Sequence, residues 1–132
     1  MPDDRGLAAV MDWLDGMKRG DAAAVARCFR LDVRWTGVPA DARCESRDEV
    51  MELLGGTFGR SVRAEALELI AGEDAIVLGV RSPDLREIGD VALPGQLYNV
   101  FAARDGLIAS VTDFVHRDEA LAAAGATEPA WS

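Results

Sequence analysis

The first half of the chain alternates apolar and polar residues with helical spacing. Residues 4–18 are predicted to form an amphipathic helix because apolar side chains follow the i, i+3, i+4, i+7 rule at Leu7, Val10, Met11, Leu14 and Met17. Gly20 ends this helix, and Asp21 can cap a second helix that runs through Phe29. A capping box, Ser46-Arg47-Asp48-Glu49, opens a third helix. The apolar stripe of that third helix is formed by Val50, Leu53, Leu54 and Phe58.

The second half changes to the period of two that is typical of strands. A short strand over 32–36 precedes this region, and strands are predicted near 63–71, 75–82, 95–104 and 107–115. Asp105-Gly106 is a strong signal for a hairpin between the last two strands. We expect an irregular connection over 83–94 with room for an extra short strand, a short final helix over 117–124 and a flexible tail over 126–132. Helices followed by an antiparallel meander predict an α+β fold in one domain spanning 1–132.

Composition narrows the class of protein further. The chain has 132 residues and 49% apolar residues, enough for one domain with a real core. Lys and Arg number 14 against 23 Asp and Glu, which gives a formal net charge of −9. This acidic balance argues against nucleic acid and anionic membrane surfaces as partners. Cys28 and Cys44 form no C-x-x-C pair, which favours a reduced, cytoplasmic setting.

Several common sites have no sequence signature here. His116 is the single histidine, so a histidine-rich zinc site cannot be built, and we expect no metal. The chain contains no G-x-x-x-x-G-K-[ST], G-x-G-x-x-G or G-x-S-x-G motif, and we expect no cofactor. The charged start of the chain is not followed by the apolar segment of a signal peptide, and no uncharged run approaches the ~20 residues that span a bilayer.

The order of these elements and several short segments resemble the nuclear transport factor 2-like superfamily, in particular its SnoaL-like bacterial members. The segments that carry the resemblance are Trp13 with Lys18-Arg19-Gly20-Asp21, Asp32-Val33-Arg34-Trp35, Ser46-Arg47-Asp48-Glu49-Val50, Asn99 to Ile108, and Arg117-Asp118-Glu119-Ala120-Leu121 with Gly125. The resemblance implies a cone: a curved antiparallel sheet whose concave face is covered by the three N-terminal helices. It also implies a cavity between sheet and helices, and a homodimer formed through the sheet. Tyr98 and Phe114 fall on the opposite sheet face, where a partner subunit could cover them.

Asp113 is the strongest candidate for acid–base chemistry. Aligned on Arg104-Asp105-Gly106, its position resembles one that supplies a pocket acid or base in epoxide hydrolases and cyclases of the superfamily. Valines flank Asp113 on the same face of the predicted strand, so its carboxyl group should be desolvated. Desolvation raises the pKa of a carboxyl group toward the range useful for proton transfer. The alternative is an Asp that pairs with a nearby arginine or lies exposed near the strand end.

The resemblance assigns roles to three more positions. Asn99 corresponds to the protonated acid of ketosteroid isomerase, and its amide could donate to a substrate oxygen. Trp13 matches the oxyanion tyrosine of that enzyme; an indole N–H could orient a ligand, and the alternative is a core tryptophan. Gly37 falls where ketosteroid isomerase places its general base, and a glycine cannot take a proton. Steroid isomerisation by that machinery is therefore not expected.

Apolar residues predicted to face the cavity complete the candidate site. They are Trp35, Leu54, Phe58, Leu78, Val80, Leu97, Phe101 and Val111, together with Trp13. For His116, a capping or exposed position is the alternative to a proton shuttle.

Two functions remain open. One is an isomerase, cyclase, dehydratase or epoxide hydrolase that acts on a small apolar organic molecule with Asp113 as acid or base. The other is a non-catalytic ligand-binding or dimerisation module of the same fold.

Overall fold

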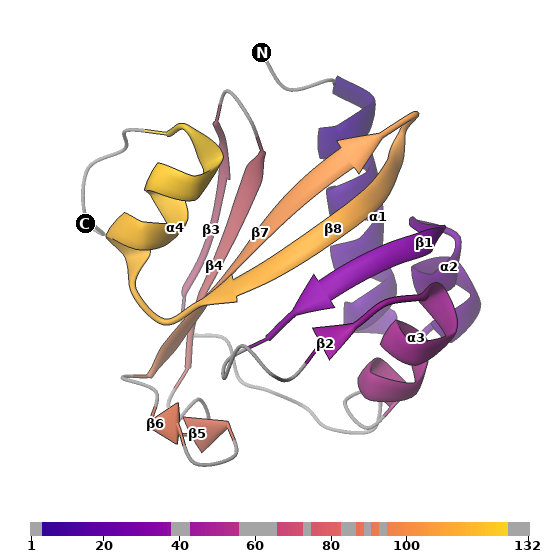
Figure 1. Cartoon of the computed structure of the whole chain (residues 1–132), viewed down its shortest axis with the longest axis horizontal. Coiled ribbons are helices and arrows are strands. Elements are labelled where there is room, and N and C mark those ends of the chain that lie inside the picture. Colours follow the sequence, from indigo (N-terminus) through magenta and orange to yellow (C-terminus); the bar gives the residue numbers. More distant parts are fainter. Residues whose placement is uncertain are drawn as a thin grey trace.

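The computed structural model describes residues 4–37, 43–55, 66–72, 75–82, 87–88, 91–92 and 95–126. In chain order, the helices and strands are α1 (Asp4–Arg19), α2 (Ala22–Ala26), β1 (Phe29–Thr36), β2 (Arg43–Cys44), α3 (Arg47–Gly55), β3 (Ala66–Ala71), β4 (Ile76–Arg81), β5 (Glu87–Ile88), β6 (Val91–Ala92), β7 (Gln96–Arg104), β8 (Leu107–Phe114) and α4 (Arg117–Ala124). Helices precede most of the strands, so the predicted α+β class is confirmed (Figure 1). The tail predicted over 126–132 lies outside the described residues except for Ala126.

A six-stranded sheet forms the centre of the fold, with the strand order β2-β1-β8-β7-β4-β3. The predicted antiparallel meander is confirmed for β3, β4, β7 and β8. The sheet as a whole is mixed rather than antiparallel, because β1 pairs with β8 in parallel. Both strands start at the same end of the sheet, where Ile108 N–H donates to the carbonyl oxygen of Cys28 at 2.8 Å. The remaining pairs of this sheet are antiparallel, and β5 and β6 form a separate short pair within the irregular connection. The cone implied by the resemblance stays a prediction.

Two hydrophobic cores lie on opposite faces of the sheet. The larger one joins α1 and α3 to the inner sheet face through residues such as Val10, Val33, Val50, Phe101 and Val111. The smaller one joins α4 to the outer face through Val77, Tyr98, Val100, Ala120 and Leu121. In Figure 1, α1 crosses behind the sheet and α4 lies over its front. The helices therefore sandwich part of the sheet.

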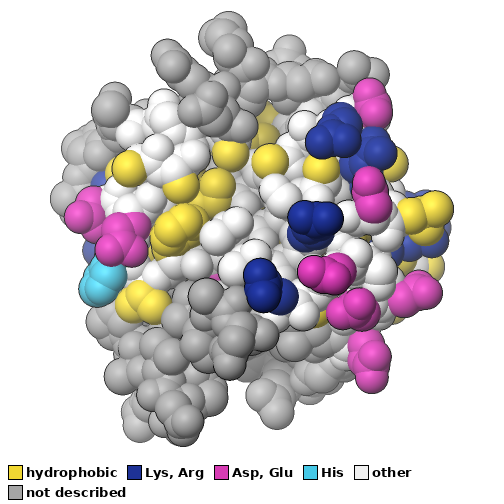
Figure 2. Space-filling model, in the orientation of Figure 1, with side chains coloured by type: hydrophobic (Ala, Val, Ile, Leu, Met, Phe, Trp, Pro, Cys, Tyr) yellow, Lys and Arg dark blue, Asp and Glu magenta, His cyan; other side chains and the backbone are white. Residues whose placement is uncertain are grey.

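The outer sheet face is more covered than the sequence suggested. Tyr98 was expected to await a partner subunit, but its exposed fraction is 0% because α4 packs over it. Phe114 is half-buried against the same core. Figure 2 shows acidic and basic side chains interspersed on the side where β1, β2 and α3 lie. Helix α4 thus covers one part of the outer face, and the part toward β1 and β2 is left open.

The helix boundaries confirm most of the capping signals. The Asp21 carboxylate accepts a hydrogen bond from Ala24 N–H at 3.1 Å, and Ser46 Oγ accepts one from Glu49 N–H at 3.2 Å. Gly125 ends α4 with φ of 68°, the left-handed conformation that glycine adopts without strain. The stripe of α1 differs at Met11, which is 54% exposed, whereas Val10 and Trp13 are buried.

The second helix is shorter than predicted, and this shifts the start of β1. We expected it to run through Phe29, but α2 ends at Ala26 and Phe29 is the first residue of β1. Phe29 lies opposite Ile108 in the parallel pair and is 1% exposed. Strand pairing and burial thus outweigh the helical spacing of a few residues, since a short helix gains little stability of its own.

A register shift in the β7–β8 hairpin moves one residue to the other face. Strict alternation along β8 would place Ile108 on the outer face and Ala109 with Val111 on the inner one. The structure pairs Ala102 with Ser110 but Ala103 with Ile108, so one residue of β8 is unpaired in between. Ile108 consequently belongs to the inner core and is 0% exposed. Bulges of this kind are not visible in an alternating pattern.

Gly72, directly after β3, lies against the last residue of α4. A Cβ built on this residue would lie 2.2 Å from the carbonyl oxygen of Ala124, which is backbone and cannot turn away. We expect Gly72→Ala to lower the free energy of unfolding by about 1–3 kcal/mol, as overpacked sites do. Urea denaturation would measure the loss. Ala123→Ser, on the exposed side of α4, serves as the control, and equal stability of the two variants would contradict the close packing.

Candidate active site

The carboxylate of Asp113 is held by donors from the strands on either side of β8. Asn99 lies directly opposite Asp113 in the β7–β8 register, and its Nδ2 donates to Oδ1 at 2.6 Å. Trp35 comes from β1 on the other side, and its Nε1 donates to Oδ2 at 2.9 Å. The two oxygens therefore accept one side-chain hydrogen bond each. Three neighbouring strands together fix this single acidic group.

Burial sets the ionisation of Asp113. Desolvation raises the pKa of its carboxyl group to about 6, while the hydrogen bonds from Trp35 and Asn99 act in the opposite direction because they favour the charged form. A carboxyl with a pKa of about 6 is mostly ionised at pH 7 and can still be protonated at an accessible cost. The arrangement therefore suits a group that accepts and returns a proton near neutral pH.

Aromatic rings line the inner side next to this carboxylate. The ring centroids of Trp13 and Phe101 are 5.1 Å apart, those of Trp13 and Trp35 are 6.3 Å apart, and those of Phe29 and Trp35 are 6.4 Å apart. Trp13 and Trp35 are only 5% and 6% exposed. Among the residues that the structure describes, Trp13 Nε1 is a buried donor without a hydrogen-bond partner. An aromatic cluster of this kind surrounds Trp35 with an apolar, tightly packed environment.

The other residues predicted to line the cavity fall into two groups. Leu78 and Val111 are buried in the inner core, and Val80 packs against it. Leu97 is half-buried and lies opposite Val80 in the β4–β7 register. The side chain of Leu54 and the whole of Phe58 lie outside the described residues. The four described residues share the sheet face of Asp113, as the alternation predicted.

Asn99 was expected to point its amide at a substrate oxygen, and the structure gives that amide a different partner. It is 7% exposed, and one of its N–H groups is used on Asp113. An amide nitrogen carries two N–H groups, so one donor remains. The bond from Trp35 to Asp113 was not predicted at all. The only signal for it was that Trp35 and Asp113 each fall on an inward face, which says nothing about which strands are neighbours.

The structure also shows the positions of His116 and of the two cysteines. His116 is exposed immediately before α4 and makes no capping hydrogen bond with its side chain. Cys28 and Cys44 are free thiols, and burial raises the pKa of both. Within the described ranges, no group of three or more His, Cys, Asp or Glu side chains is placed to hold a metal ion.

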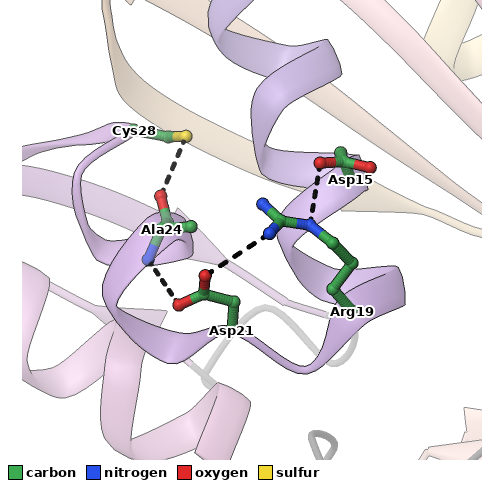
Figure 3. Close-up of polar contacts among 5 residues, drawn as sticks. All are labelled: Asp15, Arg19, Asp21, Ala24 and Cys28. Carbon is green, nitrogen blue, oxygen red and sulfur yellow. Dashed lines mark hydrogen bonds and ion pairs between the residues drawn. The ribbon is translucent and has the colours of Figure 1, made fainter.

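A cleft of about 570 Å³ lies elsewhere, between α1, α2 and the turn of the β7–β8 hairpin. Its polar lining is largely engaged in local contacts (Figure 3). Arg19 bonds Asp15 at 2.9 Å and approaches Asp21 at 3.6 Å, while Cys28 Sγ donates to the carbonyl oxygen of Ala24 at 3.4 Å. Asp15 and Arg19 are exposed, so water screens their charges. We therefore assign the candidate chemistry to Asp113 rather than to this cleft.

Comparison with known proteins assigns this fold to a family. A family model for the SnoaL-like domain matches residues 10–111, which is more than half of the chain. The protein therefore belongs to the SnoaL-like domain family, and its fold is nuclear transport factor 2-like. Among curated protein sequences, none was significantly similar to it. No helix within the described part of the chain is both long and apolar enough to cross a membrane.

Solved structures of similar fold include proteins with different assignments. A candidate polyketide cyclase from Sinorhizobium meliloti has 21% identity and a TM-score of 0.61, covering 81% of this chain and 94% of its own. A candidate ketosteroid isomerase from Kribbella flavida has 18% identity and a TM-score of 0.63, covering 98% and 84%. A nuclear transport factor 2-like protein from Burkholderia xenovorans has 15% identity and a TM-score of 0.63, covering 95% and 98%. At these identities the likeness concerns the fold and not the reaction.

Proposed function

We propose that this protein is a cofactor-independent enzyme that acts on a small, largely apolar organic molecule with Asp113 as general base and acid. The observation that supports this most directly is the half-buried Asp113, whose carboxylate is held by Trp35 and Asn99 and whose pKa desolvation raises to about 6. A partly buried group with a perturbed pKa beside an apolar surface is a candidate for proton-transfer chemistry.

In the proposed mechanism, ionised Asp113 removes a proton next to a carbonyl group or from a water molecule. Next to a carbonyl group, the C–H bond breaks, the proton moves to a carboxylate oxygen, and the electron pair of that bond shifts toward the carbonyl oxygen. With water, the O–H bond breaks in the same way while the water oxygen bonds to an epoxide carbon and the epoxide C–O bond breaks, which leaves the negative charge on the epoxide oxygen. Asn99 keeps one amide N–H for that oxygen, and Trp13 Nε1 is the second candidate donor. Asp113 then returns the proton to the product, so the cycle needs no oxidant or reductant.

The reaction classes that fit this mechanism are isomerisation, cyclisation, dehydration and epoxide hydrolysis. The fold relatives assigned as a candidate polyketide cyclase and a candidate ketosteroid isomerase support the first two. Gly37 stands where ketosteroid isomerase has its base, which argues against that enzyme's particular route. The rings of Trp13, Trp35 and Phe101 favour an apolar and flat substrate.

A non-catalytic ligand-binding or dimerisation module is the second candidate function. The dense packing of the same aromatic rings favours it, because Trp13, Trp35 and Phe101 are each no more than 6% exposed. In that case Asp113, Asn99 and Trp35 form a satisfied polar cluster that stabilises one arrangement of the sheet.

A ligand screen with product analysis separates the two candidates. The wild-type protein would be incubated with apolar ketones, epoxides and polyketide-like compounds, and native mass spectrometry would detect bound species. Dehydration and epoxide hydrolysis appear as the loss or gain of one water, and isomers or cyclised products are resolved by chromatography. Turnover that exceeds a heat-denatured control supports the enzyme. Binding without any change in the ligand supports the module.

We also propose a homodimer formed through the part of the outer sheet face that α4 leaves open. Phe114, which packs against the α4 core and still stays half-buried, supports the proposal, as does the family resemblance. Light scattering is expected to give about twice the chain mass of 14.1 kDa at micromolar concentrations. A mass that stays at that of one chain across the range would contradict the dimer. We further propose a cytoplasmic location, which the two free thiols support.

A further inference from the structure

Trp35 has a role in this site beyond that of an apolar wall. We infer that Trp35 is a positioning residue, whose indole N–H holds the Asp113 carboxylate in the orientation and charge state in which it accepts a proton. This inference rests on the proposed function of Asp113 as a base. It concerns a residue that the sequence assigned only to the lining of the cavity.

The geometry of the carboxylate carries the inference. Trp35 bonds Oδ2 at 2.9 Å and Asn99 bonds Oδ1 at 2.6 Å, so rotating the carboxylate would break both bonds. Each carboxylate oxygen has two lone-pair sites, and one on each oxygen is left for the proton of a substrate or a water. The bond from Trp35 thus fixes the direction in which the free lone pairs point, and a general base must meet its proton within hydrogen-bond reach.

The side chain of Trp35 is itself held in place. It is 6% exposed and lies between the rings of Trp13, at 6.3 Å, and Phe29, at 6.4 Å. A donor locked by packing presents its N–H in one direction, which is how a supporting residue keeps a reactive group in position. Indole can donate but not accept, so this bond always favours the ionised carboxylate over the protonated one.

Charged groups of the neighbouring elements do not offer an alternative explanation for the pKa of the Asp113 carboxyl. In the described part of α1, β1, α3, β7 and the segment after β8, most ionisable side chains are exposed: Asp12, Asp15, Lys18, Arg19, Asp32, Arg34, Asp48, Glu49, Glu52, Arg104, His116, Asp118 and Glu119. Arg30, Arg47 and Arg117 are half-buried, and two of them are bonded to other carboxylates, Arg30 to Asp32 and Asp105 and Arg117 to Glu68. Burial, Trp35 and Asn99 are the influences on its pKa that stand out. Removing the indole N–H should therefore have a direct and measurable effect on the titration of this one group.

The test is a direct titration of Asp113 in three proteins. Carbon-13 NMR of the side-chain carboxyl would be followed against pH in the wild type, in Trp35→Phe and in Trp13→Phe. We expect the midpoint of Trp35→Phe to rise by about one pH unit, because one hydrogen bond to the charged form is lost. Trp13→Phe makes the same change at a tryptophan whose indole N–H has no partner among the described residues. The midpoint of Asp113 in this variant should therefore stay within about 0.3 pH unit of the wild-type value.

A second measurement needs no substitution and so does not depend on the variants folding. In the wild type, the indole N–H proton resonance of Trp35 should shift with pH at the same midpoint as the Asp113 carboxyl, whereas that of Trp13 should not follow it. Once a substrate is known, the pH profile of kcat/KM for Trp35→Phe should shift to higher pH by the same amount as the Asp113 midpoint. In this variant kcat should be lowered and KM little changed.

The outcomes separate this inference from the proposed function. An unchanged Asp113 midpoint in Trp35→Phe, or an indole resonance of Trp35 that ignores the titration, would overturn the positioning role. A raised midpoint together with full turnover in Asp113→Asn would overturn the catalytic role of Asp113, on which the positioning role in catalysis rests. A raised midpoint, a parallel shift of the kcat/KM profile and loss of turnover in Asp113→Asn would support both.

Discussion

Asp113→Asn is expected to lower turnover of the true substrate by about 100-fold to 10,000-fold, the range that general acid–base catalysis contributes. An amide of the same size cannot take up a proton at neutral pH. The amide oxygen can still accept the hydrogen bond from Trp35, so the surrounding fold should persist. Steady-state kinetics on a substrate found by the ligand screen would measure the loss, with circular dichroism to show that the variant is folded.

Asp32→Asn is the matched control for this experiment. It makes the same chemical change on β1, at an exposed carboxylate that pairs with Arg30 at 3.0 Å on the surface. The control should retain nearly all activity. In the wild type, kcat/KM should rise with pH through about 6, as ionised Asp113 becomes available. Turnover of Asp113→Asn at the wild-type level would show that Asp113 is not the base.

The second large effect concerns the dependence of stability on pH. The pKa of Asp113 is raised from 3.8 to about 6 in the folded protein, so the folded state holds this proton more tightly than the unfolded chain does. The stabilising contribution is therefore fully present below about pH 4 and is lost as the pH rises through about 6. A shift of this size corresponds to roughly 3 kcal/mol between the fully protonated and the fully ionised limits, most of which is lost between pH 4 and pH 7.

The difference between two proteins isolates this contribution from other titrating groups. Asp32, for example, acts in the opposite direction, because the hydrogen bond from Arg30 lowers the pKa of its carboxyl. Urea denaturation of the wild type and of Asp113→Asn would be compared at several values between pH 4 and pH 8. The wild type should lose stability relative to the variant as the pH rises. A difference in unfolding free energy that stays constant would mean that the Asp113 carboxyl is not buried.

Local signals in the sequence were enough to predict the helices and the inward residues of the long strands. Ser46 and Asp21 cap the helices as expected, and alternation placed Asn99, Phe101 and Asp113 on one face. Each of these predictions depends on neighbours a few residues away along the chain. The α+β class and the family resemblance follow from the same local information.

Features that depend on distant residues could not be predicted in this way. The parallel pairing of β1 with β8 joins segments at opposite ends of the chain, and no turn motif connects them. Without it, the hydrogen bond between Trp35 and Asp113 has no visible basis. The docking of α4 on Tyr98 was also missed, since the short apolar stripe of α4 does not say which face it covers. The bulge that turns Ile108 inward is a third case.

The two hydrogen bonds on Asp113 differ greatly in the length of chain that they close. Asn99 and Asp113 are 14 residues apart and meet within one hairpin, whereas Trp35 and Asp113 are 78 residues apart. Closing the longer loop costs more chain entropy, and contacts that are distant in sequence slow folding. We therefore expect the hairpin to form its half of the carboxylate's environment early and the indole to arrive only when β1 docks. An isolated hairpin would hold Asp113 through Asn99 alone, and the second hydrogen bond on its carboxylate would form only in the completed fold.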